Sequence, residues 1–180
     1  ELFSALEKRD TDIATSVGDF IINVPKNLYV IGTMNEIDFS LERLDFALRR
    51  RFVWFFFGYN SDTLKSIIYH KKATLKSNVK DEEIDEFISK CTALNTAIEN
   101  IDDLGKQYQI GHTFFAEIVD IHESFRNLKG FPRLKLLRKN ASVKVLWDIS
   151  IKPILEAFLG NMDRTTKEEH INKLSQILLP

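Results

Sequence analysis

The stretch LYVIGTMNEIDFSLERLDFALRRRFVWFFF, at residues 28–57, decides the fold expected for this chain. Its first part, LYVIGTM (28–34), is a continuous apolar run, which is the pattern of a strand buried on both faces. A short helix follows, ends on the arginines 49–51, and leads into FVWFFFGY (52–59), a predicted strand too aromatic to be exposed. A strand, a polar tip, a helix with a cationic end and another strand are the parts of a phosphate-handling α/β core.

Composition narrows the classes of protein to which the chain can belong. Its 180 residues, 44% of them hydrophobic, suffice for one sizeable core, or for one domain and part of another. A formal net charge of −1 gives the whole chain no electrostatic footprint for nucleic acid or an anionic membrane. Cys91 is the single cysteine, which excludes an internal disulfide and a cysteine zinc cluster and fits a reducing cytoplasm. No apolar run approaches the roughly 20 residues of a membrane-spanning helix.

The chain is expected to have two parts, a small α/β part at residues 1–58 and an all-helical part at residues 59–180. In the first part an amphipathic helix opens the chain without a methionine, which suggests a piece cut from a longer protein, and FIINV (20–24) predicts a strand. From residue 60 onward the apolar spacing is helical. The predicted helices cover residues 64–75, 84–101, 108–122, 143–159 with a kink or restart at Pro153, and 171–178. The predicted fold class is therefore α/β, and mostly α.

Two sets of polar residues follow the predicted strand 28–34. Asn35 stands at its carboxyl end, where open α/β sheets place ligands, and its amide can orient a water or touch a terminal phosphate. Asn35 can equally be a turn residue that caps its own backbone. The arginines 49–51 exceed what a helix C-terminus needs, and guanidinium groups bind phosphate in a bidentate manner. The same triplet also fits a surface salt-bridge cluster or a minor nucleic-acid contact.

Two further candidates have ordinary structural explanations as well. Asp38 can cap the helix before the arginines, and Asp45 can pair with one of them. His112 follows Gly111 at a predicted helix start, where backbone N–H groups attract anions, although a lone histidine there is more often structural. No cluster of His, Cys and carboxylates has metal-ligand spacing, and no nucleophile–base set stands out.

Taken together, these motifs resemble the AAA+ superfamily and, within it, the McrB family of GTP-hydrolysing motor subunits. The order GTMN, a helix, and ALRRRF before a strand carries the wider resemblance. The narrower one rests on VPKNLYVIGTMN (24–35), YQIGHTFF (108–115) and LWDISIKPILEAFL (146–159). The resemblance implies that the chain is the C-terminal portion of an AAA+ core followed by an all-helical lid subdomain.

The resemblance also implies roles for individual residues. Asn35 matches the sensor asparagine that positions the attacking water, and Asp38 matches the aspartate of the family's Asn-Thr-Ala-Asp signature. Arg50 and Arg51 match the arginines that reach the nucleotide of the neighbouring subunit. Gly111 and His112 match the lid segment that faces the nucleotide.

The chain departs from the family pattern in ways that affect the expected nucleotide. Glu36 and Ile37 replace the Thr-Ala of the signature and Phe39 replaces the arginine after it, so ATP is as open as GTP. No G-x-x-x-x-G-K-[ST] phosphate loop occurs in the sequence. We therefore expect Mg-GTP or Mg-ATP in the intact parent protein, and no nucleotide bound to this chain alone, which is expected to be inactive.

The family implies a set of partners, and two other readings of the chain remain open. An McrB-like subunit forms a homo-oligomeric ring, works with an McrC-like nuclease subunit, and contacts DNA through regions outside this chain. The first alternative is an AAA+ ATPase of the MoxR or dynein-related kind that remodels proteins. The second is a non-catalytic AAA+ module that serves as an interaction scaffold.

Overall fold

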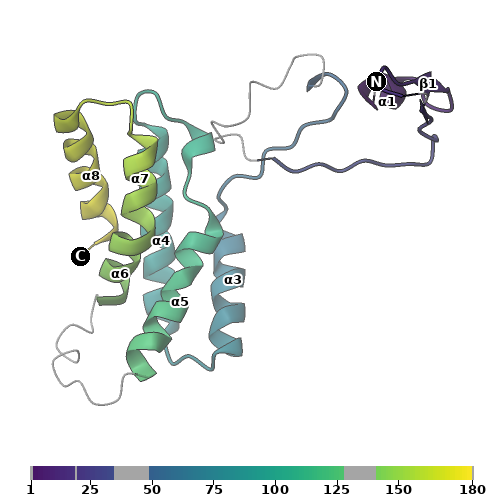
Figure 1. Ribbon diagram of the computed structural model, residues 1–180. Coiled ribbons are helices and arrows are strands. Elements are labelled where there is room, and N and C mark those ends of the chain that lie inside the picture. Colours follow the sequence, from purple (N-terminus) through teal and green to yellow (C-terminus); the bar gives the residue numbers. More distant parts are fainter. Residues whose placement is uncertain (1, 19, 35–48, 128–140, 180) are drawn as a thin grey trace. The chain divides into compact units, whose positions relative to one another are not determined.

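The computed structural model describes residues 2–18, 20–34, 49–127 and 141–179. It divides the chain into two units, Glu1–Phe57, here the N-terminal unit, and Gly58–Pro180, here the helical unit. The described residues are mostly helical, with one small two-stranded sheet (Figure 1). No helix among them is long and apolar enough to cross a membrane.

The N-terminal unit contains a short helix and a short hairpin. Helix α1 (Leu2–Glu7) confirms the predicted opening helix. Strands β1 (Ile13–Ala14) and β2 (Ile21–Ile22) pair antiparallel, with Ile13 opposite Ile22. The strand predicted at 20–24 is therefore present but shorter, because only two residues find a partner. Gly18 lies between the strands with a φ of +74°, a conformation that favours glycine.

The strands predicted at 28–34 and 52–59 were wrong for the described residues. Neither segment forms a strand, and the side chains expected in a core are exposed: 93% for Ile31 and 94% for Phe57. An apolar run indicates a tendency to be buried, but a strand also needs a neighbouring strand to accept and donate its backbone hydrogen bonds. In the part of the chain that the structure describes, β1 and β2 pair only with each other.

The helical unit is built from six α-helices and two tighter or wider helical turns among its described residues. Helices α3 (Ser61–Thr74) and α4 (Asp81–Glu99) come first, followed by a 3₁₀ turn, η1 (Lys106–Tyr108). Helix α5 is His112–Asn127. The remaining elements are α6 (Ala141–Leu146), the π-helical turn η3 (Trp147–Ile151), α7 (Lys152–Phe158) and α8 (Arg164–Leu178).

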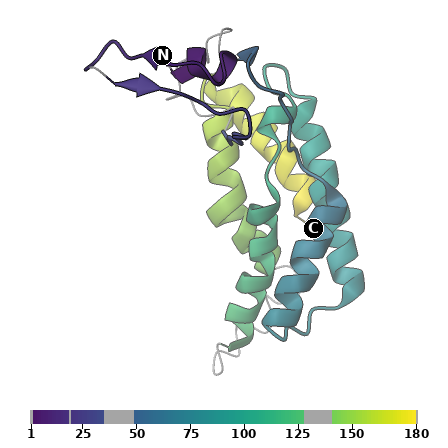
Figure 2. The same ribbon diagram turned by 90° about the vertical axis from the view of Figure 1, so that its right-hand side faces the viewer.

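These helices enclose one hydrophobic core. Helix α4 lies between α3 and α8, and α5 packs against α3 and α6 (Figures 1 and 2). The core side chains come from every helix, as the 3.6-residue spacing of the apolar positions predicts. Those that are completely buried include Leu64, Leu94, Ile98, Phe115, Leu146, Ile151, Leu155 and Leu178.

The expected interruption at Pro153 is confirmed, and its cause is visible. The backbone N–H of Lys152 donates to the carbonyl of Trp147, five residues back, which widens the helix into the π-helical turn. Pro153 has no N–H to donate and stands in the first turn of α7, where that loss is tolerated. The helix therefore restarts rather than continuing the same hydrogen-bond ladder.

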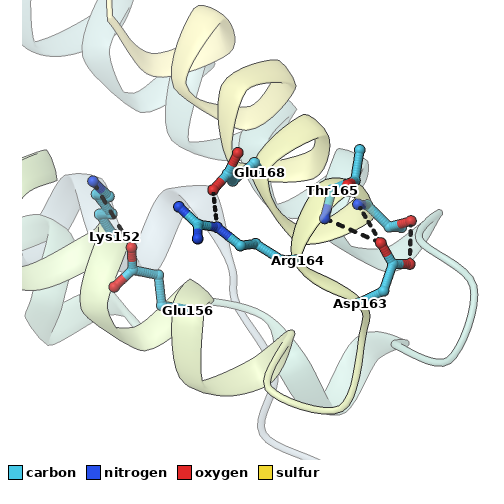
Figure 3. A network of polar contacts seen from close by, with 7 residues as sticks. Lys152, Glu156, Asp163, Arg164, Thr165 and Glu168 are labelled. Atoms are coloured by element: carbon cyan, nitrogen blue, oxygen red, sulfur yellow. Dashed lines mark hydrogen bonds and ion pairs between the residues drawn. The ribbon is translucent and has the colours of Figure 1, made fainter.

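Ion pairs and caps join the helices at their surfaces. Lysines of α3 pair with acidic residues of its neighbours, Lys65 with Asp85 of α4 at 2.7 Å and Lys71 with Asp120 of α5. Asp163 caps α8 by accepting hydrogen bonds from the backbone N–H groups of Thr165 and Thr166 (Figure 3). The Thr166 hydroxyl, which donates to Oδ2 of Asp163 at 2.6 Å, lowers the pKa of Asp163 most, and the two backbone N–H groups lower it further.

Candidate functional site

The candidate residues fall into three groups. Asn35 and Asp38 lie outside the described residues. Arg50 and Arg51 belong to the N-terminal unit, whereas Gly111 and His112 belong to the helical unit. The contacts of Arg50 and Arg51 described below lie within the N-terminal unit, and those of Gly111 and His112 lie within the helical unit.

Two of the three consecutive arginines are engaged with neighbours in the N-terminal unit. The Nε atom of Arg51 lies 2.9 Å from Oε1 of Glu7, at the end of α1, and the Arg51 side chain is only 14% exposed. The guanidinium carbon of Arg49 lies 5.6 Å from the centre of the Trp54 ring, and the Trp54 indole N–H donates to the Arg49 carbonyl at 2.7 Å. Arg50 is exposed. For Arg51, the ion pair with Glu7 therefore fits the interpretation of the triplet as a salt-bridge cluster.

His112 makes a directional contact at the start of the helical unit. The backbone N–H of Asn60 donates to Nε2 of His112 at 2.8 Å, so Nε2 is the acceptor in this contact. The Asn60 carbonyl also lies 3.1 Å from Nε2, and it accepts from the backbone N–H of Leu64 in α3. The ring also stacks on Tyr59, with centroids 5.4 Å apart and planes at 17°.

Tyr59 is held by further contacts. Its backbone N–H donates to the side-chain oxygen of Gln109 at 2.8 Å, and its hydroxyl lies 3.0 Å from the hydroxyl of Thr92 on α4. Phe115 meets the Tyr59 ring edge-on at 5.8 Å. Partial burial raises the pKa of Tyr59, and the contact with Thr92 opposes that rise.

A buried asparagine anchors the backbone just before Gly111. Asn95 of α4 is 1% exposed, and its side chain makes two hydrogen bonds to the equally buried Ile110. The Asn95 amide donates to the Ile110 carbonyl at 3.1 Å, and its carbonyl accepts from the Ile110 N–H at 2.7 Å. Both backbone groups of Ile110, which would be costly to bury alone, are thereby satisfied.

Gly111 is not required by the packing of the helical unit. A Cβ atom placed on it would meet its nearest neighbour, the Phe114 ring, at 4.0 Å, an ordinary van der Waals distance. Its backbone is also not in the left-handed region that favours glycine. An alanine would fit here as far as the fold is concerned.

The sequence analysis missed Asn95, Gln109 and Asn60, which organise this region. A signal for Asn95 was available: it lies four residues after Cys91 and three before Ile98, and therefore on the apolar face predicted for that helix. An amide at a core position indicates a buried hydrogen-bonding role. No comparable pattern marks Gln109 or the contact of Asn60 with His112, because these partners are distant in sequence.

The described residues contain no cluster of metal-binding side chains. No three of their His, Cys, Asp and Glu side chains come together in a way that could hold a metal ion. An open depression of about 740 Å³ runs along α4, and small side chains such as Ser89, Ala93 and Thr96 line it together with Ser61 of α3. The hydroxyl of Thr96 donates to the backbone of its own helix, and Asp85, the acidic residue of the lining, pairs with Lys65 of α3.

Comparison with known proteins places the chain near a subunit of a methyl-directed restriction enzyme. This relative is the Type IV methyl-directed restriction enzyme EcoKMcrB subunit of Escherichia coli (strain K12), which is 35% identical to the chain over 95 residues. The match covers 51% of this chain but 19% of that protein, so the chain spans about a fifth of the length of its relative. No protein-family model and no solved structure matches the chain.

Proposed function

We propose that this chain is part of an NTP-hydrolysing AAA+ subunit of a modification-dependent restriction system. Its substrate is GTP or ATP with Mg²⁺, and the subunit powers DNA translocation and cleavage. The observation that carries the proposal is the similarity to the McrB subunit over about half of the chain. The GTMN and ALRRRF motifs add the residue types that phosphoryl transfer uses.

In this proposal the chain contributes side chains to a site that other regions complete. The sequence contains no phosphate loop, so the β- and γ-phosphates must be bound by residues outside it. Asn35 orients the attacking water, and Asp38, Gly111 and His112 belong to the surroundings of the nucleotide. The arginine segment reaches the nucleotide of the next subunit, which requires a homo-oligomeric ring.

Arg50 and Arg51 have different parts in this arrangement. Arg50 is exposed and can extend toward a phosphate, whereas Arg51 would first have to give up its ion pair with Glu7. We assign the phosphate contact to Arg50, and to Arg51 the task of holding the end of the arginine segment against α1. An McrC-like nuclease subunit and DNA are the further partners, with DNA bound by regions outside this chain.

The test is hydrolysis of GTP and of ATP by the longer protein that contains this chain. Arg50→Ala is expected to lower kcat by on the order of 10³-fold while nucleotide binding is largely retained. Arg50→Lys keeps the charge but loses the bidentate geometry, so it should recover only part of the rate. Lys26→Ala, at an exposed ion pair of the same unit, is the control and should behave like the unsubstituted protein.

A mixing experiment tests whether Arg50 acts between subunits. Arg50→Ala subunits are combined with subunits whose upstream phosphate-loop lysine is replaced, each inactive on its own. Recovery of hydrolysis in the mixture supports action in trans, because intact sites can then form between different subunits. Unchanged kcat in Arg50→Ala, or no recovery on mixing, contradicts the assignment.

The same assays separate the alternatives. A strong preference for ATP together with protein-remodelling activity favours the MoxR or dynein-related kind. If the longer protein hydrolyses neither nucleotide and its region before this sequence lacks the phosphate-loop lysine, a non-catalytic scaffold is favoured.

A further inference from the structure

The first residues of the helical unit are fastened to the segment that leads into α5. Gln109 accepts from the Tyr59 N–H at 2.8 Å, and His112, three residues later, accepts from the Asn60 N–H at the same distance. The stack of the His112 and Tyr59 rings adds a contact that is independent of the hydrogen bonds. Segments about fifty residues apart in sequence are thus joined at two consecutive backbone amides.

The fastened residues are those that begin α3. Asn60 is the N-cap of α3, and its side-chain oxygen accepts from the backbone N–H of Thr63 at 2.8 Å. His112 is the first residue of α5. The hydrogen bond between them therefore connects the starts of two helices, and a shift of one start is passed directly to the other.

The segment that leads into α5 is also attached to α4 by hydrogen bonds. Asn95 binds both backbone groups of Ile110, so the backbone before His112 is attached to the middle of α4. A continuous set of contacts runs from α4 through Ile110 and His112 to Asn60 and α3. By contrast with these anchored residues, the aromatic side chains just before Gly58, Phe55, Phe56 and Phe57, are exposed.

We propose that His112 is a positioning residue that fixes Tyr59 and Asn60, the point where the chain enters the helical unit, against the start of α5. Resting on the proposed function, the same contact also fixes the position of Gly111, the neighbour of His112, at the nucleotide. The role depends on an acceptor atom at Nε2 and a flat ring over Tyr59. It differs from a direct contact of the histidine with phosphate, which would need a donor.

Two substitutions separate the two properties of the ring. His112→Phe keeps a flat aromatic ring next to Tyr59 but offers the Asn60 N–H no acceptor. His112→Gln removes the ring but provides a side-chain oxygen that can accept. His122→Phe, on the same helix α5, is the control for replacing a histidine by phenylalanine.

The first measurement is NMR on the whole 180-residue chain. The expected signature is a scalar coupling across the hydrogen bond between the Asn60 amide nitrogen and Nε2 of His112. Hydrogen exchange of the Asn60 amide should accelerate by on the order of tenfold in His112→Phe and much less in His112→Gln and His122→Phe. No coupling, or equal Asn60 exchange in His112→Phe and the unsubstituted chain, would overturn the proposal.

The second measurement is nucleotide hydrolysis by the longer protein. His112→Phe is expected to lower kcat by about tenfold with little change in KM, because substrate contacts remain but the geometry of the site is altered. His112→Gln should restore most of the rate. Equal kcat in all variants overturns the link to turnover. A longer protein that hydrolyses no nucleotide refutes the proposed function instead, and the NMR result then decides the positioning role alone.

Discussion

Replacing Asn95 by leucine would test the buried asparagine that anchors the helical unit. Leucine is close to asparagine in shape, so Asn95→Leu leaves little cavity and removes mainly the two hydrogen bonds to Ile110. Because Asn95 and Ile110 are both 1% exposed, water cannot replace those bonds without opening the core.

The cost follows from the groups left without partners. Each buried backbone group of Ile110 that loses its partner costs about 1–3 kcal/mol, so the two together cost roughly 2–6 kcal/mol. Burying the apolar leucine in place of the amide offsets about 1–2 kcal/mol of this. The expected loss in the free energy of unfolding is therefore about 1–4 kcal/mol.

Urea unfolding followed by far-UV circular dichroism measures this loss. The signal reports the helical unit, which contains most of the helix. With an m-value of about 2 kcal/mol per molar urea, the midpoint should fall by about 0.5–2 M. Asn100→Leu is the matched control: Asn100 is exposed and donates to the Thr96 carbonyl, so a change within about 0.5 kcal/mol is expected. A loss of less than about 1 kcal/mol in the free energy of unfolding of Asn95→Leu would show that the two hydrogen bonds to Ile110 do not stabilise the helical unit as expected.

Two further predictions concern Cys91 and Gly111. Burial raises the pKa of the Cys91 thiol well above its usual value of 9.0, so above that pH the folded state binds more protons than the unfolded state. Stability should then fall with rising pH by about 1.4 kcal/mol per pH unit more than in Cys91→Ala, as measured by urea unfolding from pH 8 to pH 10; parallel curves would contradict this. Gly111→Ala should leave the chain as stable or about 0.4–1 kcal/mol more stable in thermal unfolding, because nothing near it resists a Cβ atom. The same substitution should lower NTP hydrolysis by the longer protein if the backbone there approaches the nucleotide, and an unchanged rate would remove Gly111 from the site.

The helices of Gly58–Pro180 could be read from the sequence because their signals are local. Apolar residues at helical spacing predicted α3, α4, α5 and α8, and Pro153 predicted the restart before α7. The π-helical turn next to Pro153 was not predictable, because it depends on how the two helical segments meet the core.

The strands predicted at residues 28–34 and 52–59 show the opposite case, because they could not be predicted from local patterns. Their apolar character was correctly seen, yet neither is a strand here, because a strand exists only when another segment supplies its hydrogen bonds. The roles of Arg51 and His112 likewise depended on partners far along the chain, Glu7 and Asn60. Composition and spacing were enough to establish which residues form helices and which motifs deserve comparison with AAA+ proteins. Which side chains meet depends on long-range contacts, and those follow from the packing of the whole unit rather than from any local pattern.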